Sequence, residues 1–401
     1  MNQRPLVLLA AGRSQLPLIE RANQLGFETW AFDQEADSVG AAAATRFGVA
    51  SARDADAVLA QLRPWALEQA PAGILTGSAA PGALLAASLI GGALKLPTTK
   101  HTALKKVLDR GTQRTALIAA HVPVPPATIV LGEEEAMLSI ERLGRAVLKP
   151  AAGTSGSAGV AFATPGPELE LRVRAAAAAG DGRIVIEEIV EGDEYSIDAF
   201  ALADSTQMIS ITRKETASNP PLPMGFSTVS PTAEERGRCS LFFELVDMVA
   251  KGLNLKHTAF NLDVICTDAG PVVIEVGCFL DAKIDRLLHF GGRDVYGALC
   301  QVAVGETPTE WKPLKEGLAS RFLFTSHMVQ LSAEQMKSAE DLVAAEGAVL
   351  EWQIEAGDEV RTARSLSDTL GWILCKGKTG EDARELSCSL SDKLINLLGL
   401  N

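Results

Sequence analysis

The sequence predicts an α/β and α+β multidomain protein that begins with a parallel α/β domain. Its first 95 residues repeat a strand–turn–helix–strand order, with strands expected at 5–10, 27–32 and 73–76 and helices at 16–25 and 58–69. Such alternation is typical of a parallel sheet covered by helices. A chain of 401 residues, of which 47% are hydrophobic, is long enough for two or three domains with their own cores.

Composition excludes several classes of protein. The net charge is −13 and no basic run occurs, so no nucleic-acid partner is expected. The six cysteines form no CxxC pair and have no neighbouring histidines, which favours reduced thiols and a cytoplasmic location over a zinc site or a disulfide framework. The uncharged segment 72–94 contains Pro81 and several glycines, so a strand and a helix of small residues explain it better than a membrane span.

The remaining chain alternates helices with closely spaced strands. A helix is expected over 100–121, where VPVPP ends it, and a proline-rich surface loop over 215–232. Two strands, AFNLDVICT and PVVIEVG, are joined by the turn Asp268-Ala269-Gly270 and predict a hairpin. From about Ala319, short strands alternate with helices, which is typical of a closing α+β domain.

The stretch LKPAAGTSGSAGV, residues 148–160, follows an apolar strand. Its loop is built almost entirely from small residues, and its candidate contacts to an anion are Lys149, Gly153, Ser155, Gly156 and Ser157. Glycine lets backbone amides approach a phosphate closely, and lysine adds a positive charge. The spacing GxxGxxG fits neither a Walker loop nor a GxGxxG dinucleotide fingerprint, and a flexible linker remains an alternative.

Two sets of carboxylates follow the loop. Glu187 and Glu194 lie in EEIVEGDEYSID, expected to be a strand that bends at Gly192, and their side chains suit an amino group and a ribose diol. A solvated acidic turn is an equally good explanation of this pair. Asp263 and Glu275 lie on the two strands of the expected hairpin and alternate with apolar residues, so both can point to one face. Two carboxylates on one face suit Mg²⁺ with substrate phosphates, although charges on an edge strand would give the same pattern.

The order of these motifs resembles that of the ATP-grasp superfamily of carboxylate–amine ligases. The segment LDRGTQRTALIAAHVPVP (108–125) is similar to the family's DK-x-x-x-R…VPxP helix. The C-terminal GDEVRTARSLSDTLGWILCKGKTGEDA resembles the lid of the bacterial L-amino acid ligase branch, which includes the bacilysin dipeptide ligase. The resemblance implies an ATP-grasp fold with an N-terminal α/β domain (1–95), two ATP-grasp subdomains (96–186 and 187–315) and a C-terminal lid subdomain (316–401).

The resemblance also implies roles for individual residues. ATP would be bound through the adenine contacts Glu187, Glu188 and the Val190 backbone, through the ribose contact Glu194, and through the phosphate contacts Arg110, Lys149, Gly153, Ser155, Gly156 and Ser157. Asp263 and Glu275 would hold Mg²⁺. The implied partners are a small-molecule carboxylate and an amine of amino acid type, joined through an acyl phosphate with release of ADP and phosphate. A homodimer is the default assembly.

The sequence departs from the family pattern after Glu275. Where the family has Glu-x-Asn-x-Arg, this chain has Glu275-Val276-Gly277-Cys278-Phe279. The resemblance makes the asparagine a magnesium ligand and the arginine a contact that steadies the acyl phosphate, and both are absent here. Lys283 and Arg286 are hypothesised to supply the missing charge for catalysis, against the alternative that they are surface cations. Two other functions stay open. One is an ATP-binding regulatory or scaffolding protein without ligase activity, and the other is a nicotinamide oxidoreductase that uses Asp33, at the end of the second strand, for a ribose.

Overall fold

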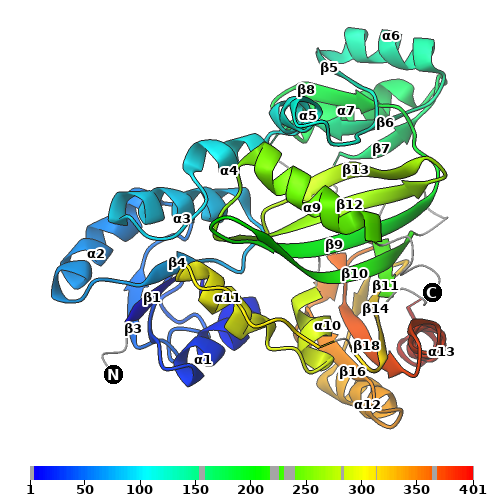
Figure 1. The fold of residues 1–401 in the computed structure, drawn as a ribbon. Helices are drawn as coiled ribbons and strands as arrows, with labels where there is room; N and C mark the ends of the chain where they lie inside the picture. Colours follow the sequence, from blue (N-terminus) through cyan, green and yellow to red (C-terminus); the bar gives the residue numbers. More distant parts are fainter. Residues whose placement is uncertain are drawn as a thin grey trace.

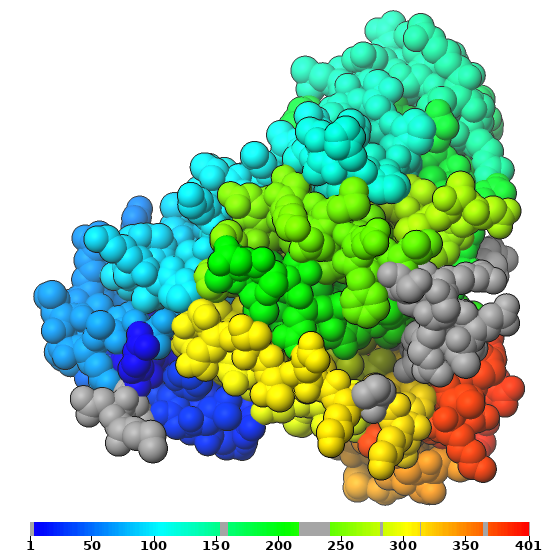
Figure 2. Space-filling view, viewed as in Figure 1, coloured from blue at the N-terminus to red at the C-terminus, as the bar shows by residue number. Residues whose placement is uncertain are grey.

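The structure is a computed structural model that describes residues 4–152, 159–216, 225–229, 240–280, 284–312, 314–363 and 368–400. Figure 1 shows the N-terminal domain at lower left, a small sheet at the top and a long sheet between them, which continues into the C-terminal part at lower right. Figure 2 shows that these parts form one continuous body on the face in view.

The N-terminal domain is a parallel sheet of four strands in the order β3-β2-β1-β4, as the strand–helix alternation predicts. All five residues of β1 are buried, because helices cover the sheet. The elements are β1 (Pro5–Leu9), η1 (Arg13–Gln15), α1 (Leu16–Gln24), β2 (Glu28–Asp33), β3 (Arg46–Val49), α2 (Ala55–Glu68), β4 (Gly73–Leu75) and α3 (Pro81–Leu94). Strand β3 was not expected from the sequence.

The uncharged segment 72–94 forms β4 and α3 of this domain. Its small residues permit close packing: a Cβ atom at Gly91 would lie 2.8 Å from Cγ2 of Thr98. In the part of the chain that the structure describes, no helix is both long enough and apolar enough to cross a membrane.

The single helix expected over 100–121 is instead two helices, α4 (His101–Leu108) and α5 (Arg110–Ala119). Asp109 interrupts them because its backbone is extended and its carboxylate caps α5 by accepting the Thr112 N–H at 2.8 Å. The Arg110 N–H donates to the carbonyl of Ala151 at 2.7 Å. The break therefore places the start of α5 beside Ala151, which follows the strand that carries Lys149.

The small sheet is antiparallel, with the strand order β5-β8-β6-β7. Its strands are β5 (Ala127–Leu131), β8 (Arg183–Glu187), β6 (Ala146–Pro150) and β7 (Ala161–Ala163), and its helices are α6 (Glu133–Leu143) and α7 (Leu169–Ala178). Ile140 of α6 and Val173 of α7 are buried in one core with Leu148 and Ile186, so the helices cover one face of this sheet. The side chains that alternate with Leu148 and Ile186 point to the opposite face of the sheet, which these two helices do not cover.

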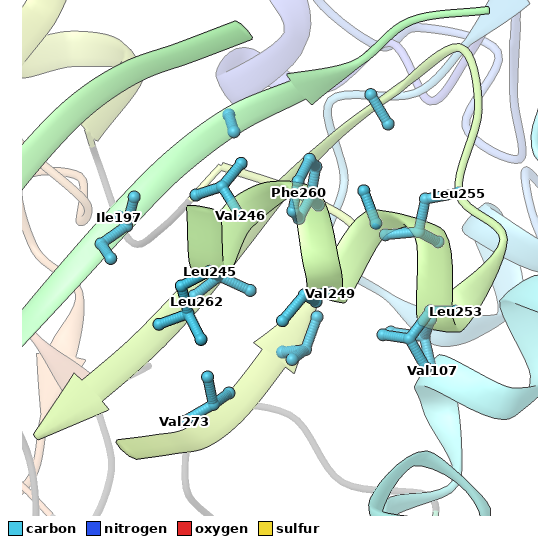
Figure 3. Close-up of a cluster of buried hydrophobic side chains, with 14 of the residues drawn as sticks. Val107, Ile197, Leu245, Val246, Val249, Leu253, Leu255, Phe260, Leu262 and Val273 are labelled. Carbon is cyan, nitrogen blue, oxygen red and sulfur yellow. The ribbon is translucent and has the colours of Figure 1, made fainter. Parts of the chain in front are cut away.

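The long sheet contains eight antiparallel strands in the order β13-β12-β9-β10-β11-β14-β18-β16. The strands are β9 (Asp193–Ala201), β10 (Thr206–Thr216), β11 (Gly225–Val229), β12 (Thr258–Thr267), β13 (Gly270–Gly277), β14 (Gly317–Leu323), β16 (Val349–Trp352) and β18 (Gly371–Gly377). Helix α9 (Ser240–Leu253) packs on one face, where Val246 and Val249 meet Ile197 and Leu262 (Figure 3). Side chains that alternate with these residues face the opposite side.

The stretch 215–232, expected to be a surface loop, contains strand β11, which pairs with β10 and β14. Residues 217–224 and 230–239 lie outside the described part of the chain. The last three strands of the long sheet come from the C-terminal part, which therefore shares the central sheet and adds only a two-stranded sheet of its own among the described residues. The remaining elements are α10 (Ile284–Phe290), α11 (Val295–Ala303), α12 (Ala333–Ala344), α13 (Gly380–Leu398), β15 (Val329–Gln330) and β17 (Glu359–Val360).

Candidate active site

A cleft of about 720 Å³ lies where the two antiparallel sheets meet the N-terminal domain. Residues of all three parts border it, including Gln15 and Thr76 from the N-terminal domain and Tyr296 from α11. The cleft brings together eight of the residues that the sequence predicts for the site: Lys149, Glu187, Glu188, Val190, Glu194, Asp263, Glu275 and Arg286. These residues are far apart in sequence, so the fold assembles them.

A buried ion-pair cluster forms one wall of the cleft. Lys149 Nζ lies 2.8 Å from Glu187 Oε2 and donates to the Ile274 carbonyl, also at 2.8 Å. Arg114 of α5 donates to the other oxygen of Glu187 and, at 3.2 Å, to the Val273 carbonyl. Because all three charged residues are at most 7% exposed, each depends on its partners to offset the loss of water.

Asp263 and Glu275 occupy directly opposite positions on β12 and β13. Residues directly opposite on an antiparallel pair share one face, so the predicted hairpin and the shared face are confirmed. Each carboxylate has its own cation: Lys214 Nζ lies 2.7 Å from Asp263 Oδ1, and Arg110 Nη2 lies 2.8 Å from Glu275 Oε1. Burial raises the pKa of Glu275, but the charges of Arg110 and Lys149 outweigh burial and hold that pKa below its usual value.

Glu187 and Glu194 belong to different sheets. The strand expected to bend at Gly192 is two strands, β8 and β9, joined by residues 188–192. A Cβ atom at Gly192 would lie 2.1 Å from the Cys266 carbonyl oxygen, and the residue has φ of 151°, so only glycine fits this link. Glu188 and Val190 border the cleft from the link, and Glu194 does so from the start of β9.

Arg286 lies at the junction of three parts of the chain. Its side chain donates to the Ser14 carbonyl at 3.4 Å, and its Nε lies 3.7 Å from Asp285 Oδ2 and 3.8 Å from Glu351 Oε2. The guanidinium is thus held by the N-terminal domain, α10 and β16, and borders the cleft at the end near the parallel sheet. Its catalytic role remains a prediction.

Five predicted site residues lie outside the described part of the chain: Gly153, Ser155, Gly156, Ser157 and Lys283. Three residues that the sequence reasoning did not select belong to the site. Arg114 is the arginine of the 108–125 motif, and its match to that motif is a signal that could have identified it. Lys214 and Asn261 also border the cleft, and only Asn261 had a signal in the sequence, because it alternates with Asp263 on one strand.

Asp33, which the nicotinamide alternative uses for a ribose, accepts hydrogen bonds from the backbone. Its carboxylate accepts the Ala11 N–H at 2.7 Å and the Glu35 N–H at 3.1 Å. It therefore fixes the turn after β1 to the end of β2.

Comparisons with known proteins identify the fold. Residues 145–282 match the family model of the ATP-grasp domain. The uncharacterized protein y4rH of Sinorhizobium fredii is 28% identical over 222 residues, which are 53% of this chain and 45% of that protein. The chain thus spans about half the length of this curated relative.

Solved structures with similar folds cover the chain from end to end. The L-amino acid ligase from Bacillus licheniformis has a TM-score of 0.76 at 17% identity and covers 98% of both chains. An ADP complex of N5-carboxyaminoimidazole ribonucleotide synthetase has a TM-score of 0.78 at 15% identity and covers 100% of both chains. At such identities the similarity establishes the fold. Residues 145–282 therefore match the ATP-grasp domain, and the chain has the ATP-grasp fold, as the order of its motifs predicts.

Proposed function

We propose that the protein is an ATP-dependent carboxylate–amine ligase that forms an amide or peptide bond through an acyl phosphate. The observation that carries this proposal is the convergence of Lys149, Arg110 and Lys214 on three carboxylates that border one cleft. Cations and carboxylates side by side suit a site that must bind phosphates and a divalent metal together.

The nucleotide would lie between the two antiparallel sheets. A carboxylate offers about four acceptor positions, so Glu187 keeps capacity for the adenine amino group after binding Lys149 and Arg114. The Val190 backbone borders the same region, and Glu194 is placed to accept from ribose hydroxyls on the other side of the 188–192 link. Lys149 would neutralise phosphate oxygens as a point charge.

Asp263 and Glu275 fit a magnesium ion. Both are oxygen ligands on one face, and Mg²⁺ commonly takes one or two carboxylates together with substrate phosphates. Bound there, the metal would neutralise charge on the phosphates during transfer. Arg110 and Lys214, which now neutralise these two carboxylates, would then be available to the phosphates or to the acyl oxygen.

The proposed reaction has two steps. A carboxylate oxygen of the first substrate attacks the γ-phosphorus, the bond to the β-phosphate oxygen breaks, and ADP leaves. The amine nitrogen of the second substrate then attacks the acyl carbon, phosphate leaves with the bonding electrons, and the nitrogen loses a proton to form the amide. The protein would mainly position the reactants and offset their charge.

The end of the cleft near the N-terminal domain would hold the acid and the amine. Polar groups of Gln15, Thr76, Tyr296 and Arg286 border it. A volume of about 720 Å³ suits a nucleotide with small substrates, and we propose substrates of amino acid type, like those named for the ligase of similar fold.

The direct test is ADP release by the purified protein with Mg²⁺, ATP and panels of carboxylic acids and amines. Release should require one acid and one amine together, and an acid labelled with ¹⁸O should pass one labelled oxygen to the released phosphate. Lys149→Met, which should bind ATP more weakly, serves as the control that ADP release comes from this site.

A second candidate function is that of a regulatory ATP-binding protein. It is favoured by Gly277 and Phe279, which stand where the family has asparagine and arginine. ATP binding without ADP release from any substrate pair would support that candidate and reject the ligase.

A further inference from the structure

We propose that Asn261 supplies an amide oxygen to the magnesium ion, in place of the asparagine that the family pattern puts at position 277. This inference rests on the proposed binding of magnesium and ATP. In this proposal, strand β12 provides the magnesium ligand that the family has on β13, two residues after the position of Glu275.

Asn261 occupies the position on β12 that this role requires. It precedes Asp263 by two residues, so both side chains point to the same face of the strand. Its direct partner on β13 is Gly277, just as the partner of Asp263 is Glu275. The four positions therefore form two adjacent cross-strand pairs on the face of the sheet that borders the cleft.

The amide oxygen of Asn261 is buried without a partner. The residue is 3% exposed, and Oδ1 has no hydrogen-bond donor among the described residues. Buried polar groups in native proteins are normally satisfied, so an orphaned acceptor beside two carboxylates indicates a ligand that completes it. Asn261 also borders the cleft, which gives such a ligand a route to the group.

Gly277 and Asn261 depend on each other sterically. A Cβ atom at position 277 would lie 2.4 Å from Asn261 Oδ1 and 2.7 Å from Cε1 of Phe279. An asparagine at 277 thus cannot coexist with Asn261 and Phe279 in their present positions. The glycine at 277 therefore leaves the space that the Asn261 amide occupies on the opposite strand.

The chemistry of the amide suits the ion. Carbonyl oxygens of asparagine are hard ligands of the kind that Mg²⁺ and Ca²⁺ accept. Within the described residues, no group of three His, Cys, Asp or Glu side chains is arranged to hold a metal ion, so the two carboxylates lack a third acidic partner. A neutral oxygen would complete the set and leave the charges of Asp263 and Glu275 balanced against one divalent ion.

The test measures nucleotide affinity by titration calorimetry, with a non-hydrolysable ATP analogue, in Mn²⁺ and in EDTA. Asn261→Ala should weaken binding of the manganese–nucleotide complex about tenfold or more, because a metal contact is lost. Binding of the metal-free nucleotide should change less than twofold. Asn261→Asp should keep the manganese-dependent affinity, since a carboxylate oxygen replaces the amide oxygen.

Gln207→Ala is the matched control. Gln207 lies on β10 of the same sheet and has another buried amide oxygen without a partner, but it does not border the cleft. Its variant should bind the manganese–nucleotide complex like the wild type. Unchanged affinity in Asn261→Ala, equal losses in Asn261→Ala and Asn261→Asp, or an equal loss in Gln207→Ala would overturn the inference while leaving the proposed function intact. Absence of nucleotide binding by the wild type would overturn both.

Discussion

Lys149 and Glu187 are diagonal neighbours on the antiparallel strands β6 and β8, where Lys149 pairs with Val185 and Glu187 with Val147. Their side chains therefore meet on one face, and the lysine charge is fixed at the cleft at 2.8 Å from its carboxylate. We expect Lys149→Met to lower the affinity for ATP about tenfold or more, because a phosphate contact worth about 1.5–3 kcal/mol is lost. Calorimetric titration with ATP measures this change.

Lys337→Met is the control for that variant. Lys337 forms a similar pair with Asp341 at 2.7 Å, but both side chains are exposed on α12. It should bind ATP like the wild type. Equal affinities for all three proteins would contradict the placement of phosphates near Lys149.

Arg114 contributes to stability through Glu187. Arg114→Leu leaves a carboxylate that is 2% exposed with only one of its two cations, so we expect unfolding free energy to fall by about 3–5 kcal/mol. Urea denaturation measures the loss. In Arg174→Leu, which breaks ion pairs of a 60% exposed arginine, the loss should be much smaller, because water already solvates both charges. Similar losses in the two variants would show that burial of the Glu187 cluster does not matter.

Arg286 provides a test of the substrate end of the cleft. We expect Arg286→Ala to reduce kcat about 10²-fold, as loss of a charge at a developing anion does, while the affinity for ATP stays unchanged. Arg361→Ala, which removes an arginine that is 83% exposed, is the control for charge alone. Unchanged turnover in Arg286→Ala would remove this residue from the catalytic set.

Glu215 should make stability depend on pH. Its carboxylate lies between β10 and α13 and accepts from Arg384 and, at 3.0 Å, from Arg321. Burial raises the pKa of Glu215, but the hydrogen bond from Arg384 and the arginine charges outweigh burial and hold it below 4.5. A lowered pKa in the folded state stabilises the protein above the unfolded value, and this stability is lost as pH falls through the folded pKa.

Glu215→Gln should therefore be less stable than the wild type at pH 7 by about 1–3 kcal/mol, and the difference should shrink as pH falls below 4.5. Urea midpoints at pH 7 and pH 4 measure both effects. Glu385→Gln, at an exposed position in the interior of α13, should match the wild type at either pH. If the difference in stability between the wild type and Glu215→Gln stayed constant with pH, the ion pairs of Glu215 with Arg321 and Arg384 would not contribute to stability.

Sequence pattern was sufficient to predict the hairpin and the fold class. The hairpin of Asp263 and Glu275 was predictable because polar and apolar residues alternate on both strands and a tight turn joins them. The parallel sheet at the N-terminus followed from regular strand and helix spacing, and the ATP-grasp fold followed from motif order. The hairpin and the parallel sheet depend on residues close together in sequence, whereas the ATP-grasp fold was implied by the resemblance in motif order along most of the chain.

Features that depend on distant partners could not be predicted. Lys214 meets Asp263 only because β10 and β12 both pair with β9. Strand β11 lies in a proline-rich stretch whose composition favours a loop, and its pairing with β14 overrides that preference. The break at Asp109 likewise needs the carbonyl of Ala151 as partner for the next amide.

The unbroken ladder from β13 to β16 has a consequence for how the molecule opens. The strand that carries Glu275 and the last strands of the chain belong to one hydrogen-bonded unit, whereas the strand that carries Lys149 belongs to another. Amide protons across the long sheet should therefore exchange with solvent cooperatively, and those of the small sheet should do so with separate energetics. Lys149 lies in the small sheet, whereas Asp263 and Glu275 lie in the long sheet. A ligand that contacts all three residues would therefore couple the local unfolding of the two sheets.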